Sequence, residues 1–261
     1  MGKIKVFLSD WQVLFREGIH FTLSGEEDFE VIGEATANDD ALAFIEGNVP
    51  QVAVLNINGG KLNGIETTRR IKQNLPSVSV ILVMDSDDEE KRFLALKSAA
   101  SACTTKDIDP DDLIDLIRLV AEGSYPISQS LLKPGVASRT VAEFEAVLAM
   151  GEPLSNLMAY LTPIENDILG KANEVNSKEE IIQVLGINDW AVEQNLELIR
   201  TKLVANEHSR RLVEAAQSIL PVMPQARFAG RPVVDYVTRD EFFAFKESLK
   251  EHFKSFTGEL V

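Results

Sequence analysis

Short apolar runs and helical repeats alternate over the first 130 residues of the chain. Runs of β-branched and aliphatic residues predict strands, and apolar residues that recur every three to four positions predict amphipathic helices. The predicted strands lie at residues 4–8, 29–34, 52–57, 78–84 and 102–105, and the predicted helices at residues 15–24, 38–47, 65–74, 89–98 and 110–122. Because strands and helices alternate, we expect an α/β domain over residues 1–130, with a doubly wound five-stranded parallel sheet covered on both faces.

Residues 131–160 are predicted to form a linker. Pro134 and Gly135 interrupt the pattern at the start of this segment, and a helical repeat follows at residues 141–150. We therefore expect a linker that carries one helix of its own.

An all-α helix-turn-helix domain is predicted over residues 161–205. Thr162 is a suitable N-cap, and Pro163 occupies the first turn of a helix, where its missing N–H does no harm. Ser177 is placed to cap the next helix. A helix, a Gly-containing turn and a second helix follow, at residues 178–185, 186–188 and 189–203. This succession is typical of helix-turn-helix units.

Residues 206–261 are expected to form a small, mainly helical C-terminal extension. Its last helix places five apolar residues on one face, at spacings of three and four: Phe242, Phe245, Leu249, Phe253 and Phe256. This face either packs on its own domain or forms a subunit interface, since a small domain has little surface to cover so many phenylalanines. We treat the five residues as a candidate oligomerisation interface and expect a homodimer.

Charge and composition narrow the range of possible partners and functions. Residues 204–261 are neutral, so the excess acid, 33 acidic against 18 basic residues, lies in residues 1–203 and should repel a polyanion such as DNA unless a local basic face overrides it. No apolar run approaches the roughly 18 residues of a membrane span, and the chain enters a strand directly, so we expect a cytoplasmic protein with no membrane partner. The scattered histidines lack ligand spacing, and we expect no metal and no cofactor.

Three phrases in the first 130 residues resemble a receiver domain of the NarL/LuxR branch of response regulators: "LSDWQVLFREGI", "VLNINGGKLNGIETTRRIK" and "TTKDIDPDDLIDLIRLVAEG". Residues 161–203 resemble the LuxR-type DNA-binding domain of the same branch. The first resemblance implies a pocket at the carboxyl ends of the strands, in which magnesium and a lysine assist phosphorylation of an aspartate. A Ser/Thr hydroxyl then bonds to the phosphoryl group and moves, and an aromatic residue follows it.

The resemblance places six residues of this chain at the pocket positions: Asp10, Trp11, Asn56, Met84, Cys103 and Lys106. Asn56 stands where the phosphorylated aspartate is expected, and its neutral amide is a poor nucleophile. Trp11 replaces a second magnesium carboxylate, Met84 the hydroxyl and Cys103 the aromatic residue. The pocket is therefore expected to be a degenerate phosphoacceptor site without enzymatic activity, in which Asp10 and Lys106 pair with each other.

The second resemblance implies DNA contacts from the helix at residues 189–203. The candidates are Trp190, Glu193, Gln194, Asn195, Arg200 and Lys202. Trp190 is expected to pack rather than to stack on a base. Residues 161–203 contain eight acidic and four basic residues, which opposes the electrostatic part of DNA binding.

Two hypotheses follow. The first is an atypical response regulator that binds DNA and regulates transcription in signal transduction without phosphorylation, with DNA affinity weakened by its acidic recognition helix. The alternative is a protein-interaction module, or adaptor, that keeps both folds but has lost phosphotransfer and DNA contacts. Either hypothesis allows a regulatory protein partner.

Overall fold

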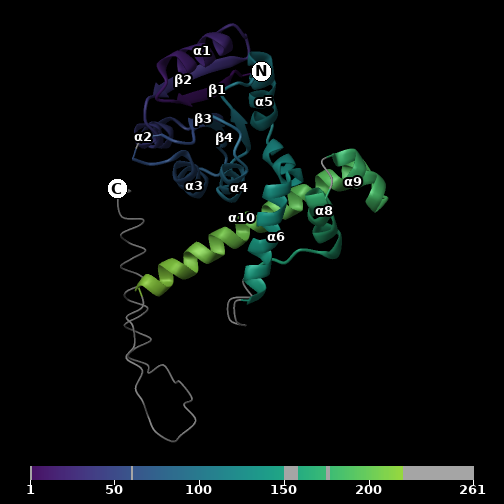
Figure 1. Ribbon diagram of the computed structural model, residues 1–261. Coiled ribbons are helices and arrows are strands. Elements are labelled where there is room, and N and C mark those ends of the chain that lie inside the picture. The colour runs from purple at the N-terminus through teal and green to yellow at the C-terminus, as the bar shows by residue number, and fades with distance from the viewer. Residues whose placement is uncertain (1, 60, 150–157, 175–176, 220–261) are drawn as a thin grey trace, which may run out of the picture. The chain divides into compact units, whose positions relative to one another are not determined.

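The computed structural model describes residues 2–59, 61–149, 158–174 and 177–219 (Figure 1). The chain divides into two compact units, Met1–Ser218 and Ile219–Val261. The candidate interface residues Phe242, Phe245, Leu249, Phe253 and Phe256 lie outside the described residues. Within the described part, no helix combines the length and the apolar character needed to cross a membrane.

A five-stranded parallel sheet forms the centre of the first unit, as predicted. Its strands are β1 (Ile4–Ser9), β2 (Phe29–Ala35), β3 (Val52–Asn56), β4 (Ser79–Met84) and β5 (Ala102–Thr105), in the order β2-β1-β3-β4-β5. β3 and β4 are buried along their whole length, because helices cover both faces of the sheet. The strand order reverses direction between β1 and β3, and in such sheets this is where ligands bind.

The helices of the α/β region are α1 (Val13–Ser24), α2 (Asn38–Asn48), α3 (Gly64–Asn74), α4 (Glu89–Lys97) and α5 (Pro110–Ala121). Apolar residues of α1 and α5 share one buried cluster with one face of the sheet. Those of α2, α3 and α4 pack in a second cluster on the other face (Figure 1). Each predicted strand and helix of this region is confirmed, to within one or two residues at its ends.

The predicted linker is a packed part of the fold. A 3-10 helix, η1 (Pro126–Leu132), is followed by α6 (Pro134–Ala149), which begins earlier than the helix predicted at residues 141–150. Pro134 was read as an interruption, but proline is well tolerated in the first turn of a helix. A Cβ at Gly135 would come within 2.0 Å of the Glu89 carboxylate, so the glycine permits the close approach of α6 to α4.

The helix-turn-helix pair is formed by α9 (Lys178–Leu185) and α10 (Asp189–Ile219), and α8 (Pro163–Glu174) precedes it. Gly186, which ends α9, has a φ of 65°, a left-handed conformation that favours glycine. The predicted domain boundary between residues 205 and 206 is wrong, because α10 runs unbroken through it for 31 residues. Neither glycine nor proline occurs within α10.

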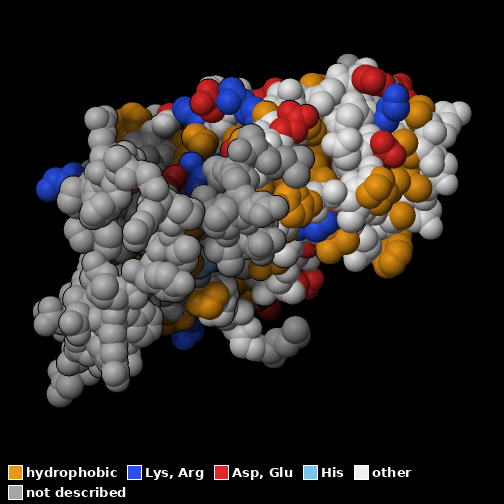
Figure 2. All heavy atoms as spheres, turned by 90° about the horizontal axis from the view of Figure 1, so that it is seen from below, with side chains coloured by type: hydrophobic (Ala, Val, Ile, Leu, Met, Phe, Trp, Pro, Cys, Tyr) orange, Lys and Arg blue, Asp and Glu red, His pale blue; other side chains and the backbone are white. Residues whose placement is uncertain are grey.

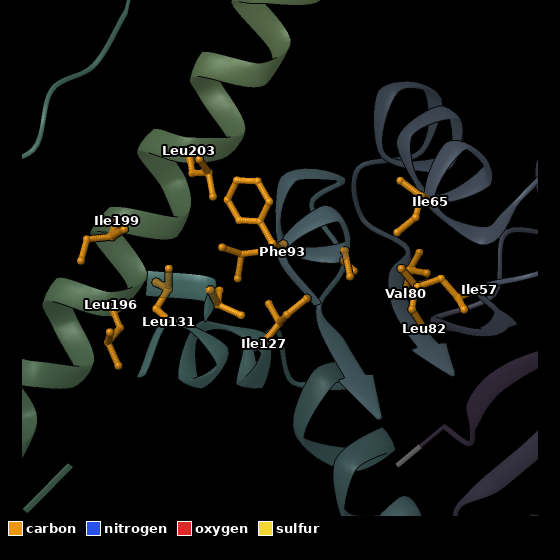
Figure 3. Close-up of a cluster of buried hydrophobic side chains, with 14 of the residues drawn as sticks. Ile57, Ile65, Val80, Leu82, Phe93, Ile127, Leu131, Leu196, Ile199 and Leu203 are labelled. Atoms are coloured by element: carbon orange, nitrogen blue, oxygen red, sulfur yellow. The ribbon is translucent and has the colours of Figure 1, made fainter. Parts of the chain in front are cut away.

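One hydrophobic core joins the helix-turn-helix pair to the α/β region. Leu196, Ile199 and Leu203 of α10 lie in the same buried cluster as Leu131 of η1 and Phe93 of α4 (Figure 3). In this view Leu203 of α10 points toward the Phe93 ring of α4. The described residues thus have a continuous core rather than two cores separated by a linker.

Farther along α10, a buried ion-pair network reinforces the contact between this helix and the α/β region. The Glu207 carboxylate of α10 lies 3.0 Å from Nζ of Lys97 and 2.7 Å from the guanidinium of Arg210. Burial raises the pKa of Glu207, but hydrogen bonds from Arg210 and Lys97 outweigh it and lower the pKa on balance. The carboxylate is therefore charged at neutral pH and holds α10 against α4.

Candidate functional site

Four of the predicted pocket residues meet at the carboxyl edge of the sheet. Asp10 follows β1, Asn56 ends β3, Met84 ends β4 and Lys106 follows β5. Because β1, β3, β4 and β5 are consecutive neighbours in a parallel sheet, their ends lie side by side. The structure therefore brings these residues together as predicted.

The Asn56 amide is bonded at both ends. Its Nδ2 donates to Oδ2 of Asp10 at 2.7 Å, and its Oδ1 accepts from the backbone N–H of Asn58 at 2.7 Å. Only 1% of Asn56 is exposed to solvent. An aspartate at position 56 could not donate the first bond and would face Asp10 as a like charge. The amide thus fixes the end of β3 to the segment after β1.

Lys106 supplies the positive charge of the pocket. Its Nζ lies 3.1 Å from Oδ2 of Asp10, 2.9 Å from Oδ1 of Asp85 and 3.0 Å from Oε1 of Gln12. The hydrogen bond from Lys106 lowers the pKa of Asp85, so this carboxylate is ionised at neutral pH. The predicted pairing of Asp10 with Lys106 is confirmed, and Asp85 shares the same ammonium group.

The loop after β3 is held close to the strand end by two glycines. A Cβ at Gly64 would come within 2.6 Å of the Asn56 carbonyl oxygen, and a Cβ at Gly59 within 2.6 Å of Nδ2 of Asn38. Nδ2 of Asn38 also donates to the Asn56 carbonyl at 2.9 Å. Because glycine has no Cβ, the loop can pack this closely against the end of β3, which leaves the strand end little freedom to move.

The remaining pocket positions are packed or turned outward. Met84 is fully buried, and the Trp11 ring is exposed, with Nζ of Lys106 5.4 Å from its centroid. Burial raises the pKa of the Cys103 thiol to about 12, so the thiol is protonated at neutral pH. Asp10, Asn56 and Met84 are all buried, with 3%, 1% and 0% of each residue exposed.

All four basic residues of the described part of residues 161–203 are engaged in ion pairs. Lys171 pairs with Glu174, Lys178 with Asp189 and Glu193, Arg200 with Glu197, and Lys202 with Glu165. The last pair is the most buried, because Glu165 is inaccessible to solvent and lies 2.6 Å from Nζ of Lys202. No base of this region is left free to meet a phosphate.

The six candidate DNA contacts do not form one surface. Arg200 is buried, with its guanidinium 3.7 Å from the centre of the Tyr125 ring, and Lys202 turns toward Glu165. Nδ2 of Asn195 donates to the Ala191 carbonyl of its own helix at 2.7 Å.

Glu193 pairs with Lys178 and also accepts from Nε2 of Gln129 in η1. Trp190 and Gln194 are exposed. Trp190 is 69% exposed, so the prediction that it packs in the domain is wrong. As the second residue of α10, it lies at the helix end, where it contributes little to the core.

Residues 6–118 match the response regulator receiver domain family. The chain is 28% identical over 228 residues to the transcriptional regulatory protein DegU of Brevibacillus brevis, a match that covers 83% of this chain and 94% of the relative. The nitrate/nitrite response regulator protein NarL of Escherichia coli is 27% identical over 198 residues, which cover 76% of this chain and 88% of NarL. By this match residues 6–118 are a response regulator receiver domain, and most of the chain is similar to response regulators of the NarL/LuxR type. A third relative, the DNA-binding transcriptional activator DevR/DosR of Mycobacterium tuberculosis, is 26% identical over 214 residues, with 82% and 94% of the two chains covered.

The receiver pocket does not fit a magnesium ion. Mg²⁺ needs oxygen ligands and usually more than one carboxylate. Both oxygens of Asp10 already accept hydrogen bonds, Oδ1 from the Gln12 N–H at 2.7 Å and Oδ2 from Asn56. The Lys106 ammonium occupies the position next to this carboxylate, and Trp11 offers no oxygen. The pocket is arranged for internal pairing of Asp10 with Asn56 and Lys106.

Sequence reasoning missed several residues that complete the receiver pocket and the helix-turn-helix domain. Gln12 and Asn58 tie the pocket to its loops, and Asp85 shares Lys106. Asp85 directly follows Met84, so its place at the strand end was readable from the sequence. Glu165, which pairs with Lys202, was not among the predicted site residues. It closes a capping box with Thr162, whose N–H donates to Oε2 of Glu165 at 2.7 Å.

Proposed function

We propose that this response regulator acts in transcription regulation without phosphorylation of its receiver domain. The observation that carries the proposal is the 2.7 Å hydrogen bond from Nδ2 of Asn56 to Asp10, at the position where the family phosphorylates an aspartate. The names of the relatives, two of which describe transcriptional regulators, support the role in transcription. We expect no phosphotransfer and no other enzymatic activity.

Intact-mass measurement tests the first part of the proposal. The full chain is incubated with magnesium and a small phosphodonor such as acetyl phosphate, and no added phosphate is expected, because the Asn56 amide is a poor nucleophile and the pocket does not fit magnesium. The Asn56→Asp variant is the matched comparison, and we expect it to stay unmodified as well, since Trp11 and Met84 remain. A stoichiometric mass gain in the wild-type chain would falsify the proposal.

DNA binding through α10 is the first way in which the chain could act. The fold and the DNA-binding relative favour it, and Gln194 can read an adenine edge from the major groove. The paired bases oppose it, because counterion release by free Lys and Arg supplies most of the affinity for DNA.

A second candidate function, that of a protein-interaction module, is favoured by the same pairing. A helix-turn-helix surface without free bases and with exposed apolar residues suits a protein better than a polyanion. Fluorescence-anisotropy titration against genomic DNA fragments separates the two candidates. Binding with a clear salt dependence would support DNA as the target, and no binding even near 50 mM salt would leave the interaction module.

A further inference from the structure

The outward side of the helix-turn-helix pair carries three large, exposed apolar side chains. Trp190, Gln194 and Leu198 recur every four residues along α10, so they lie on one side of the helix. Trp190 is 69% exposed and Leu198 is 51% exposed, and Val184 of α9 is 58% exposed. We call Val184, Trp190, Gln194 and Leu198 the docking face. In Figure 2, hydrophobic side chains gather at the end of the molecule that carries α8 and α9 in Figure 1.

The docking face is not a by-product of a poorly packed helix. Val192, Leu196, Ile199 and Leu203, on the opposite side of α10, are fully buried in the shared core. The helix therefore has one complete apolar side for folding and carries a second apolar strip that folding does not use. Large apolar side chains grouped on a surface are typical of interaction sites.

The charges around the docking face select its occupant. The four nearby bases are neutralised by ion pairs, whereas Asp167, Glu179 and Glu180 are exposed acids beyond those pairs. DNA is repelled by this surplus. A second copy of the chain is also disfavoured, because the whole chain has a net charge of -15 and the same face carries the same acids. The complementary partner has apolar side chains flanked by lysine or arginine.

We infer that the docking face binds an amphipathic, basic segment of a partner protein. This inference rests on the second candidate function and names its partner class. Trp190 supplies the largest anchor, since an exposed indole can bury much area at low entropic cost. Gln194 offers hydrogen bonds in the middle of the strip, and the exposed acids of α8 and α9 steer the basic flanks of the segment.

A synthetic helical peptide of leucine and lysine, with the leucines on one face, is the test probe. Fluorescence anisotropy of the labelled peptide is followed while the full chain is added at physiological salt. We expect binding, and we expect the Trp190→Ser, Leu198→Ser double variant to weaken it at least ~10-fold. A leucine and glutamate peptide of the same pattern should not bind, because the acids repel it.

The matched control is the double variant Leu14→Ser, Phe21→Ser, which removes two apolar side chains of α1 that are even more exposed, at 90% and 83%. It should bind the basic peptide within about twofold of the wild-type affinity, a difference well under the 1.4 kcal/mol of a tenfold change. Circular dichroism checks that both variants are folded, which is expected because all four side chains are exposed.

Three results would overturn the inference. The first is unchanged peptide binding by the Trp190→Ser, Leu198→Ser variant. The second is duplex DNA binding at low salt that this variant abolishes, which makes the face a nucleic-acid site. The third is a dimer in light scattering that the variant dissociates, which makes a second copy the occupant. Phosphate incorporation is measured independently of all three, so failure of the docking face leaves the proposal of phosphorylation-independent action intact.

Discussion

The receiver pocket and the docking face differ in where their side chains find partners. In the pocket, the amide of Asn56 and the ammonium of Lys106 both bond to the carboxylate of Asp10. On the docking face, Trp190 and Leu198 are exposed to solvent. The polar groups of the pocket find their bonding partners within the pocket, whereas the apolar side chains of the docking face are exposed. The pocket is thus closed by its own bonds, whereas the docking face offers its side chains to another molecule.

The sharpest contrast lies between two leucines of α10. Leu196→Ala should lower the free energy of unfolding by about 4 kcal/mol, because the side chain is fully buried and its removal leaves a cavity. Leu198→Ala should change it by less than about 0.5 kcal/mol, because half of this side chain is already in water. Urea unfolding of the two variants measures both values. Equal losses would show that the docking face is part of the core and would break the comparison.

The internal pairing of the receiver pocket is tested by Lys106→Met. The change leaves Asp10 buried without its cation and should lower the free energy of unfolding by about 3 kcal/mol. The control is Lys171→Met, which removes a more exposed ion pair with Glu174 and should cost less than about 1 kcal/mol. Both are measured by urea unfolding at neutral pH. A loss no larger than that of the control would mean that the pocket does not depend on its pairing.

The smallest effect is expected at the rim of the pocket. The hydrogen bond from Lys106 lowers the pKa of Asp85 in the folded chain, so its contribution to stability is present above the unfolded pKa of about 4 and is lost as the pH falls through the lower folded value. Asp85 is nearly half exposed, and solvent screening keeps this contribution below about 0.5 kcal/mol. Asp85→Asn should therefore lower the melting temperature slightly at pH 7 and not at all below the folded pKa. A difference in melting temperature between Asp85→Asn and the wild type that grows as the pH falls would contradict this expectation.

The α/β fold could be predicted from the sequence because its strands are short, apolar and separated by amphipathic helices. The pocket positions came from the resemblance, which located Asp10, Asn56 and Lys106 but not the groups that bond to them. Gln12 and Asn58 were missed because they come from loops, whose paths no periodicity describes. Only the structure, and not the spacing of residues in the sequence, shows that both Nδ2 and Oδ1 of Asn56 are hydrogen-bonded.

Two errors on the helical side have clear physical causes. The domain boundary after residue 205 assumed a break, although α10 contains no glycine or proline to end a helix. The list of DNA contacts counted Arg200 as available, although it follows Leu196 by one turn and so shares the buried side of the helix. A helical wheel of residues 189–219 could have shown both.

The unbroken α10 has a mechanical consequence. At 1.5 Å per residue, its 31 residues form a rod about 46 Å long. The first half of the rod is held in the core by Val192, Leu196, Ile199 and Leu203, and Glu207 pairs with Lys97 one turn farther on. Because a continuous helix resists bending, the residues after Glu207 continue in the direction that the packed half sets. Trp190 and Leu198 therefore belong to the same rigid element as the residues beyond the core.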